Sequence, residues 1–198
     1  MITRLVLIRH GITKWNKQKR YCGHKDIGIS CEGKIQAKRL HNHLKAVGFD
    51  KIYASDSKRA IQTAKMIFKD AKINKIRELK EINFGVLEGL QYKEIIKKYN
   101  GIYKKWLKNP YKYRIPKAES MNAFKKRVCL AIKKITRINE GKAIAIVCHG
   151  GTIAIFISSI LKNKNFWRHV PSAASTTTVE YKKGKPKIIQ FNKTKHLS

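Results

Sequence analysis

The sequence predicts an α/β fold, in which three layers (α/β/α) enclose a mostly parallel, mixed sheet. Short apolar runs recur at 5–8, 51–54 and 143–147, and such runs are typical of buried parallel strands. Longer segments at 32–47, 57–69 and 120–138 place apolar residues three and four apart, which favours helices. The chain has 198 residues, and that length suits one domain.

In the first half of the chain, the run 5–8 is a predicted strand and 32–47 a helix with Ile35, Leu40 and Leu44 on one face. Gly48 is the predicted stop of that helix. A second strand is expected at 51–54. Ser57 is a plausible N-cap for the helix at 57–69, although Ser55 and Asp56 compete with it for that role.

The remaining elements follow the same reasoning. The run 143–147 is the clearest buried strand, and Gly150-Gly151 turns it into a helix. The turn Lys183-Gly184 predicts an antiparallel hairpin between its flanking segments. The predicted elements after residue 70 are a strand at 73–76, short helices at 91–99 and 102–107 around Gly101, helices at 120–138 and 152–161, and strands at 143–147, 176–181 and 186–191.

The charge of the chain is strongly basic. Lys and Arg number 45 against 12 Asp and Glu, which gives a formal net charge of +33. Such a charge attracts nucleic acid, anionic lipid or small anionic substrates. The lysines are scattered along the chain, however, whereas nucleic-acid grooves gather arginine with aromatic residues. We therefore favour a dispersed basic surface and do not expect nucleic acid as a partner.

Cysteine content and hydropathy bear on the compartment. Cys22, Cys31, Cys129 and Cys148 form no CxxC pair, and a chain this rich in apolar residues does not need disulfides. No apolar run reaches the ~18 residues of a membrane span. The first apolar run is interrupted by Arg9 and His10, which argues against a signal peptide. We expect reduced thiols in a cytoplasmic protein with no membrane association.

Two predicted strands each end in a histidine followed by glycine. Arg9-His10-Gly11 follows the first strand, and Cys148-His149-Gly150 follows the strand at 143–147. The carboxyl ends of parallel strands meet at the edge where α/β sheets bind ligands. Glycine at such a turn allows the backbone to approach a ligand and direct its N–H groups at an anion.

A third strand end adds an arginine to this edge. Arg59 lies in the first turn of the helix at 57–69, where the helix dipole is positive. Arginine matches phosphate oxygens with two parallel hydrogen bonds, so Arg9 and Arg59 indicate a phosphate more specifically than the lysines do. The sequence thus predicts a pocket for a dianion.

Six ordered segments resemble the histidine phosphatase superfamily, which has the phosphoglycerate mutase-like fold. The segments are RHGITKWN at 9–16, GHKDIGISCEG at 23–33, SDSKRAIQTA at 55–64, LKEINFGVLEG at 79–89, PKAES at 116–120 and VCHGG at 147–151. The resemblance covers the whole chain and is closest to the small α-ribazole and broad-specificity phosphatases. It implies one histidine phosphatase domain over 1–198, with a lid-like helical segment at about 90–118.

The resemblance also implies roles for individual residues. His10 would be the nucleophile that forms a phosphohistidine, provided that its other ring nitrogen is held by a hydrogen bond. His149 would donate to a phosphoryl oxygen, and Glu81 would be the general acid and base. For Glu81 this requires a raised pKa, so burial and the arriving phosphate dianion must together offset the nearby cations, which lower it. The implied phosphate-binding residues are Arg9, Arg59, Asn16, Gly11 and Gly150.

Three functions remain open at this point. The first is a phosphomonoesterase that acts on a small phosphorylated metabolite, with α-ribazole 5′-phosphate as a candidate. The second is a cofactor-dependent phosphoglycerate mutase, for which 198 residues leave little room. The third is a basic nucleic-acid-binding protein on a degenerate phosphatase fold. The proposed chemistry requires no cofactor and no metal, and the sequence leaves a homodimer open.

The predicted lid segment holds four aromatic residues, which would either stack on a substrate or pack against the core: Tyr103, Trp106, Tyr111 and Tyr113.

Overall fold

The computed structural model describes residues 1–163 and 165–197, and the two other positions of the predicted 1–198 domain lie outside this description. The described residues form one six-stranded sheet in the order β3-β2-β4-β1-β5-β6. Its strands are β1 (Ile2–Arg9), β2 (Lys51–Ser55), β3 (Ile73–Ile76), β4 (Ala143–Cys148), β5 (Thr176–Lys182) and β6 (Lys185–Lys193). Strands β3, β2, β4 and β1 are parallel, whereas β5 is antiparallel to β1 and β6. The mixed, mostly parallel sheet is as predicted.

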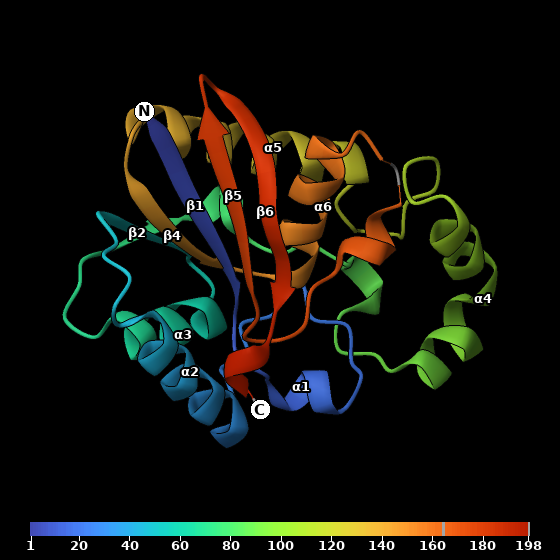
Figure 1. Cartoon of the computed structure of the whole chain (residues 1–198). Coiled ribbons are helices and arrows are strands. Elements are labelled where there is room, and N and C mark those ends of the chain that lie inside the picture. The colour runs from blue at the N-terminus through green and yellow to red at the C-terminus, as the bar shows by residue number, and fades with distance from the viewer. Residues whose placement is uncertain (164, 198) are drawn as a thin grey trace.

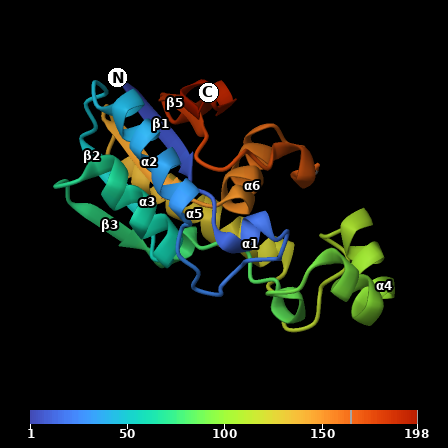
Figure 2. The same ribbon diagram turned by 90° about the horizontal axis from the view of Figure 1, so that it is seen from below.

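Helices cover both faces of this sheet (Figures 1 and 2). Helices α2 (Cys31–Leu44) and α3 (Lys58–Phe68) pack together on one face, and α5 (Met121–Ile138) and α6 (Gly150–Ile160) pack on the other. The alternation of β1 explains both layers, because Leu5 and Leu7 point into the core under α5 and α6 while Val6 and Ile8 point under α2 and α3. All four side chains are nearly or fully buried.

Helix α4 (Tyr92–Lys108) projects away from the sheet in both views. The sequence predicted two short helices around Gly101, and α4 indeed consists of two helical segments that join at a kink at Tyr99, where φ is −137°. The observed interruption therefore lies two residues before Gly101. Tyr103 and Trp106 are buried in a separate core cluster beneath this segment, so the packing interpretation holds for these two residues.

The other boundaries differ from prediction by a few residues. Helix α2 begins at Cys31, because the Ser30 hydroxyl accepts a hydrogen bond from the Gly33 N–H, and it ends at Leu44 instead of 47. Val47 donates its N–H to Leu44 O in a tight turn and packs on the core, which ends the helix early. Short turns that the periodicity did not predict are α1 (Lys14–Lys17), η1 (Arg77–Leu79), η2 (Gly85–Leu87), η3 (Phe166–His169) and η4 (Lys195–Leu197).

Two further predictions concern the chain as a whole. Cys22, Cys31, Cys129 and Cys148 are all free thiols. Within residues 1–163 and 165–197, none of the helices combines the length and the apolar character that a membrane span requires.

Candidate active site

The carboxyl ends of three parallel strands converge on one point. His10 follows β1, Ser55 ends β2 and His149 follows β4. The His10 N–H donates to Cys148 O at 3.0 Å, which ties the first and third of these ends together. The ring centroids of His10 and His149 are 5.2 Å apart. The structure thus brings together the two histidines that the sequence placed at separate strand ends.

His10 is buried in its neutral form. Its Nδ1–H donates to Gly11 O at 2.8 Å, which is a backbone carbonyl of the kind that the sequence argument required. A neutral imidazole has one N–H, so Nε2 carries the lone pair, and it accepts from Arg59 Nε at 3.2 Å. Burial lowers the pKa of His10 well below its usual value, and Arg59 and Arg9 lower it further. His10 Nε2 is therefore available as a nucleophile.

Arg59 is held more firmly than the sequence suggested. Its Nη2 donates to Gly23 O at 2.8 Å and its Nη1 donates to Lys25 O at 3.1 Å. Its Nε lies 3.2 Å from both His10 Nε2 and His149 Nδ1. The guanidinium fork expected to grip a phosphate is thus already engaged with backbone carbonyls on one side, and Arg59 directly orders the two imidazoles.

His149 has no solvent-exposed surface and lies behind His10. Its Nδ1 accepts from Arg59 Nε, and its Nε2 lies 2.8 Å from Ser55 Oγ. Burial lowers the pKa of His149 well below its usual value, and the charge of Arg59 adds to this effect. The ring is therefore neutral in the free protein.

Glu81 is a buried carboxyl held by two backbone amides. Its Oε2 accepts from Gly151 N at 2.8 Å and its Oε1 accepts from Ile82 N at 2.9 Å. Burial raises the pKa of Glu81, while these two N–H groups, followed by Arg59 and Arg9, oppose the rise. A side chain at position 151 would not fit, since a Cβ built there lies 2.2 Å from Glu81 Oε1. Gly151 is thus a site residue that the sequence analysis did not single out.

Arg127 is a second residue that the sequence analysis missed. From α5 it donates to three carbonyls of the segment that carries the acid, those of Glu78 at 2.7 Å, Lys80 at 2.8 Å and Glu81 at 2.9 Å. Both oxygens of Glu119 accept from the same guanidinium at 2.7 Å. This fork fixes the backbone on which Glu81 is mounted. The position of Arg127 in the helical pattern of α5 does not indicate this role, because its partners come from other segments of the chain.

These groups border a cavity of about 210 Å³. Five of the predicted site residues line it, namely Arg9, His10, Asn16, Glu81 and Gly150. Arg59 and His149 lie behind the wall formed by His10. The lining residues that were not predicted are Lys19, Arg20, Tyr21, Cys22, Phe84, Gly151, Phe166, Trp167 and Val170.

Arg9 and Asn16 present donors to this cavity. The Nη1 of Arg9 donates to Pro171 O, while Arg9 Nε is buried and has no hydrogen-bond partner within the described part of the chain. Burial lowers the pKa of Arg9 from its usual value, although an arginine stays charged at neutral pH. Asn16 Oδ1 accepts from the Thr13 N–H at 3.0 Å, so its amide NH₂ remains as a donor.

Gly11 serves a different purpose from the one expected. Its N–H donates to Thr63 Oγ1 at 3.0 Å and is not directed at the cavity as a free donor. A Cβ at position 11 would lie 2.6 Å from Gly33 O, so the glycine permits the close approach of the segment to the start of α2. The contribution of Gly11 to the site is its carbonyl, which holds His10.

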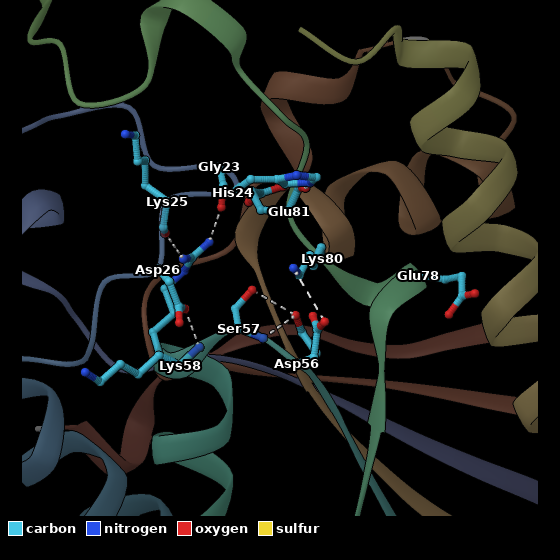
Figure 3. Close-up of polar contacts among 12 residues, drawn as sticks. Gly23, His24, Lys25, Asp26, Asp56, Ser57, Lys58, Glu78, Lys80 and Glu81 are labelled. Carbon is cyan, nitrogen blue, oxygen red and sulfur yellow. Dashed lines mark hydrogen bonds and ion pairs between the residues drawn. The ribbon is translucent and has the colours of Figure 1, made fainter.

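Two other glutamates close to Glu81 in the sequence lie elsewhere. Glu88 accepts backbone N–H groups from His24 at 2.7 Å and Lys25 at 2.8 Å, so it organises a loop. Glu78 stands apart from Glu81 in Figure 3 and lines a groove along α5. The cavity therefore combines donors for an anion, an unprotonated imidazole nitrogen and one buried carboxyl, which is the equipment for transferring a phosphoryl group.

Comparison with known proteins gives a consistent result. The family model of the histidine phosphatase superfamily (branch 1) matches residues 5–194. A broad-specificity phosphatase of Saccharomyces cerevisiae is 33% identical, covering 99% of this chain and 88% of the relative. The adenosylcobalamin/α-ribazole phosphatase of Escherichia coli is 31% identical, covering 80% of this chain and 79% of the relative. The crystal structure of an Entamoeba histolytica phosphoserine phosphatase mutant with phosphoserine superposes with a TM-score of 0.90, at 31% identity, over 99% of this chain and all of that one.

Proposed function

From the premise that this chain belongs to the histidine phosphatase superfamily, we propose that it hydrolyses a small phosphorylated metabolite through a phosphohistidine on His10. The observation that carries the proposal is the state of His10, which lines the cavity: Nδ1 donates to Gly11 O, and the unprotonated Nε2 accepts from Arg59 Nε. A nucleophile prepared in this way, next to a buried acid, suits phosphoryl transfer.

The reaction has two steps. In the first, His10 Nε2 attacks phosphorus while the bond to the ester oxygen breaks, and Glu81 gives its proton to the departing alkoxide. The charges of Arg9 and Arg59 stabilise the equatorial oxygens, to which Asn16 and Gly150 add neutral donors. In the second step, water attacks the phosphohistidine, Glu81 takes a proton from that water, and His10 leaves as a neutral imidazole.

The substrate is proposed more narrowly from two sources. The relatives named above include a phosphatase for α-ribazole and one for phosphoserine. Phe84, Phe166 and Trp167 line the cavity, and aromatic walls suit the flat base of a ribazole. We therefore propose α-ribazole 5′-phosphate as the first substrate to test, with phosphoserine as the second.

A turnover screen tests this proposal. The purified protein is given α-ribazole 5′-phosphate, phosphoserine, and 3-phosphoglycerate with its bisphosphate primer, and both inorganic phosphate and isomerised product are measured. We expect phosphate release from at least one phosphomonoester. Isomerisation of 3-phosphoglycerate without phosphate release would instead establish the mutase alternative, which has support in relatives named as phosphoglycerate mutases.

We also propose that the protein acts in the cytoplasm and that the helical segment at about 90–118 is a lid that moves with substrate. A homodimer is tested by sedimentation. Binding of nucleic acid is tested by titration with salt, because displaced counterions impose a steep salt dependence on any phosphate-backbone contact.

A further inference from the structure

Ser55 lies on the far side of His149 from His10. It is the last residue of β2, it has no exposed surface, and its Oγ is 2.8 Å from His149 Nε2. The other ring nitrogen, Nδ1, faces Arg59 Nε. One ring nitrogen of His149 thus faces Arg59, next to His10, and the other faces a serine.

The contacts fix where that proton lies in the free protein. Arg59 keeps its single Nε–H, which is shared between His10 Nε2 and His149 Nδ1, so each of these two nitrogens faces that proton with a lone pair. A neutral imidazole has a single N–H, and this one is therefore on Nε2 and donates to Ser55 Oγ. In this tautomer the ring presents a lone pair to the region beside His10, where it would repel a phosphoryl oxygen.

To bind a phosphoryl oxygen, His149 needs its proton on Nδ1. A doubly protonated ring is disfavoured, because His149 is fully buried and both Arg9 and Arg59 are close enough to lower its pKa. The remaining route is the other neutral tautomer, in which Nε2 becomes an acceptor. Its partner must then donate to it. A hydroxyl can change from acceptor to donor, whereas a carbonyl or a carboxylate cannot.

Ser57 supplies a second, independent observation. It occupies the N-cap position of α3, yet among the described residues its side chain makes no capping hydrogen bond. Asp26 Oδ1 instead accepts from Lys58 N at 2.7 Å (Figure 3). Ser55 Oγ donates to Ser57 Oγ at 3.3 Å and accepts from Ser57 N at 3.4 Å. Ser55 Oγ can therefore donate to Ser57 while it accepts from His149, or donate to His149 while it accepts from Ser57.

We propose that Ser55 is a positioning residue that sets the tautomer of His149, so that this ring donates to the transferring phosphoryl group while it stays neutral. The inference rests on the proposed function. In the exchange, the Nε2 proton passes to Ser55 Oγ, the former Ser55 proton passes to Ser57 Oγ, and the Ser57 proton passes to water. Water that enters with the phosphate gives one proton to His149 Nδ1, and the Arg59 Nε–H that faced Nδ1 donates to a phosphoryl oxygen instead. Ser55 then donates to Nε2 and accepts from Ser57, and the charge of the ring is unchanged.

The experiment combines a spectroscopic and a kinetic measurement. NMR spectra of protein labelled with ¹⁵N in histidine are recorded with and without saturating inorganic phosphate. The ¹⁵N chemical shift of each ring nitrogen shows whether it carries a proton or a lone pair. The burst rate of phosphorylation is measured for wild type, Ser55→Ala and Ser55→Thr. Ser158→Ala is the matched control, because Ser158 Oγ lies 2.9 Å from His169 Nδ1 and forms the same kind of pair outside the cavity.

In the wild type, phosphate should move the His149 proton from Nε2 to Nδ1. Ser55→Ala should lower the burst rate roughly 10- to 100-fold, the cost of an unpaired buried group, and should prevent a clean Nδ1–H signal. Ser55→Thr should restore most of the rate, and Ser158→Ala should not change it.

Two results would overturn the inference. One is phosphate-bound wild type with His149 protonated on Nε2 alone or on both nitrogens, a measurement that needs no variant to fold. The other is a wild-type burst rate in Ser55→Ala. If no phosphohistidine forms on His10 in the wild type, the proposed function itself fails. That failure is distinguishable, because the tautomer of His149 is measured by NMR without any turnover.

Discussion

Gly151→Ala tests whether the carboxyl of Glu81 is the proton donor, because the structure places the new methyl group on that carboxyl. The added Cβ would lie 2.2 Å from Glu81 Oε1 and 3.1 Å from Oε2, whereas ordinary contact begins at 3.4 Å. The carboxyl must therefore retreat by about 1 Å, and its 2.8 Å hydrogen bond to the residue 151 amide is lost or lengthened. A misplacement of this size typically costs about 10²-fold in rate.

The loss should depend on the leaving group. An alkoxide needs a proton as its bond to phosphorus breaks, whereas para-nitrophenolate leaves without one. We expect Gly151→Ala to slow phosphorylation by an alkyl phosphate by about 10²-fold and by para-nitrophenyl phosphate much less. Burst rates in single-turnover experiments are the right measurement, since hydrolysis of phosphohistidine also uses the carboxyl and would mask the contrast in the steady state.

Gly48→Ala is the control, because a Cβ at that position meets nothing within 4 Å. Equal losses for the two substrates in Gly151→Ala would refute the reasoning. So would a wild-type burst rate with the alkyl phosphate, because the geometry leaves no room for the methyl group without moving Glu81.

Three further predictions follow from the same contacts. Glu81→Gln should slow the alkyl phosphate burst by ~10²–10⁴-fold and the nitrophenyl burst far less, and equal losses would remove Glu81 as the acid. Arg59→Lys keeps the charge but not the four contacts of the guanidinium, so it should lose roughly 2–4 kcal/mol of transition-state stabilisation, while surface Lys69→Ala does little. The pKa values of His10 and His149 are lowered in the folded protein, so below about pH 6.5 the unfolded chain binds protons that the folded one does not. The free energy of unfolding should therefore fall with decreasing pH, by up to about 1.4 kcal/mol per pH unit for each imidazole. A His149→Gln variant should show a smaller slope of unfolding free energy against pH, and an unchanged slope would contradict this.

The sequence predicted those features that depend on local pattern. Apolar runs and helical spacing located the strands and most helices, and the rule that parallel strands end at one edge brought His10 and His149 together. The family resemblance implied Glu81 as the acid, and of the glutamates at 78, 81 and 88 the structure places Glu81 alone in the cavity. Its roles in catalysis remain predictions.

The features that were missed depend on which segments approach one another in the folded chain. Arg59 has its fork engaged because the carbonyls of Gly23 and Lys25 lie beside it, and no spacing in the sequence indicates that approach. The amide of Gly11 is likewise used by Thr63, 52 residues away. Arg127 is one basic residue among 45, and only the structure shows that it holds the segment of the acid.

The central claim is that His10 carries the phosphoryl group, and the most direct test is to trap it. Enzyme mixed with substrate is quenched during the burst, digested and examined by mass spectrometry. The account predicts an acid-labile phosphate on His10 and, for His10→Ala, a loss of at least ~10³-fold in turnover. Phosphate trapped on any other residue, or turnover that survives His10→Ala, would contradict it.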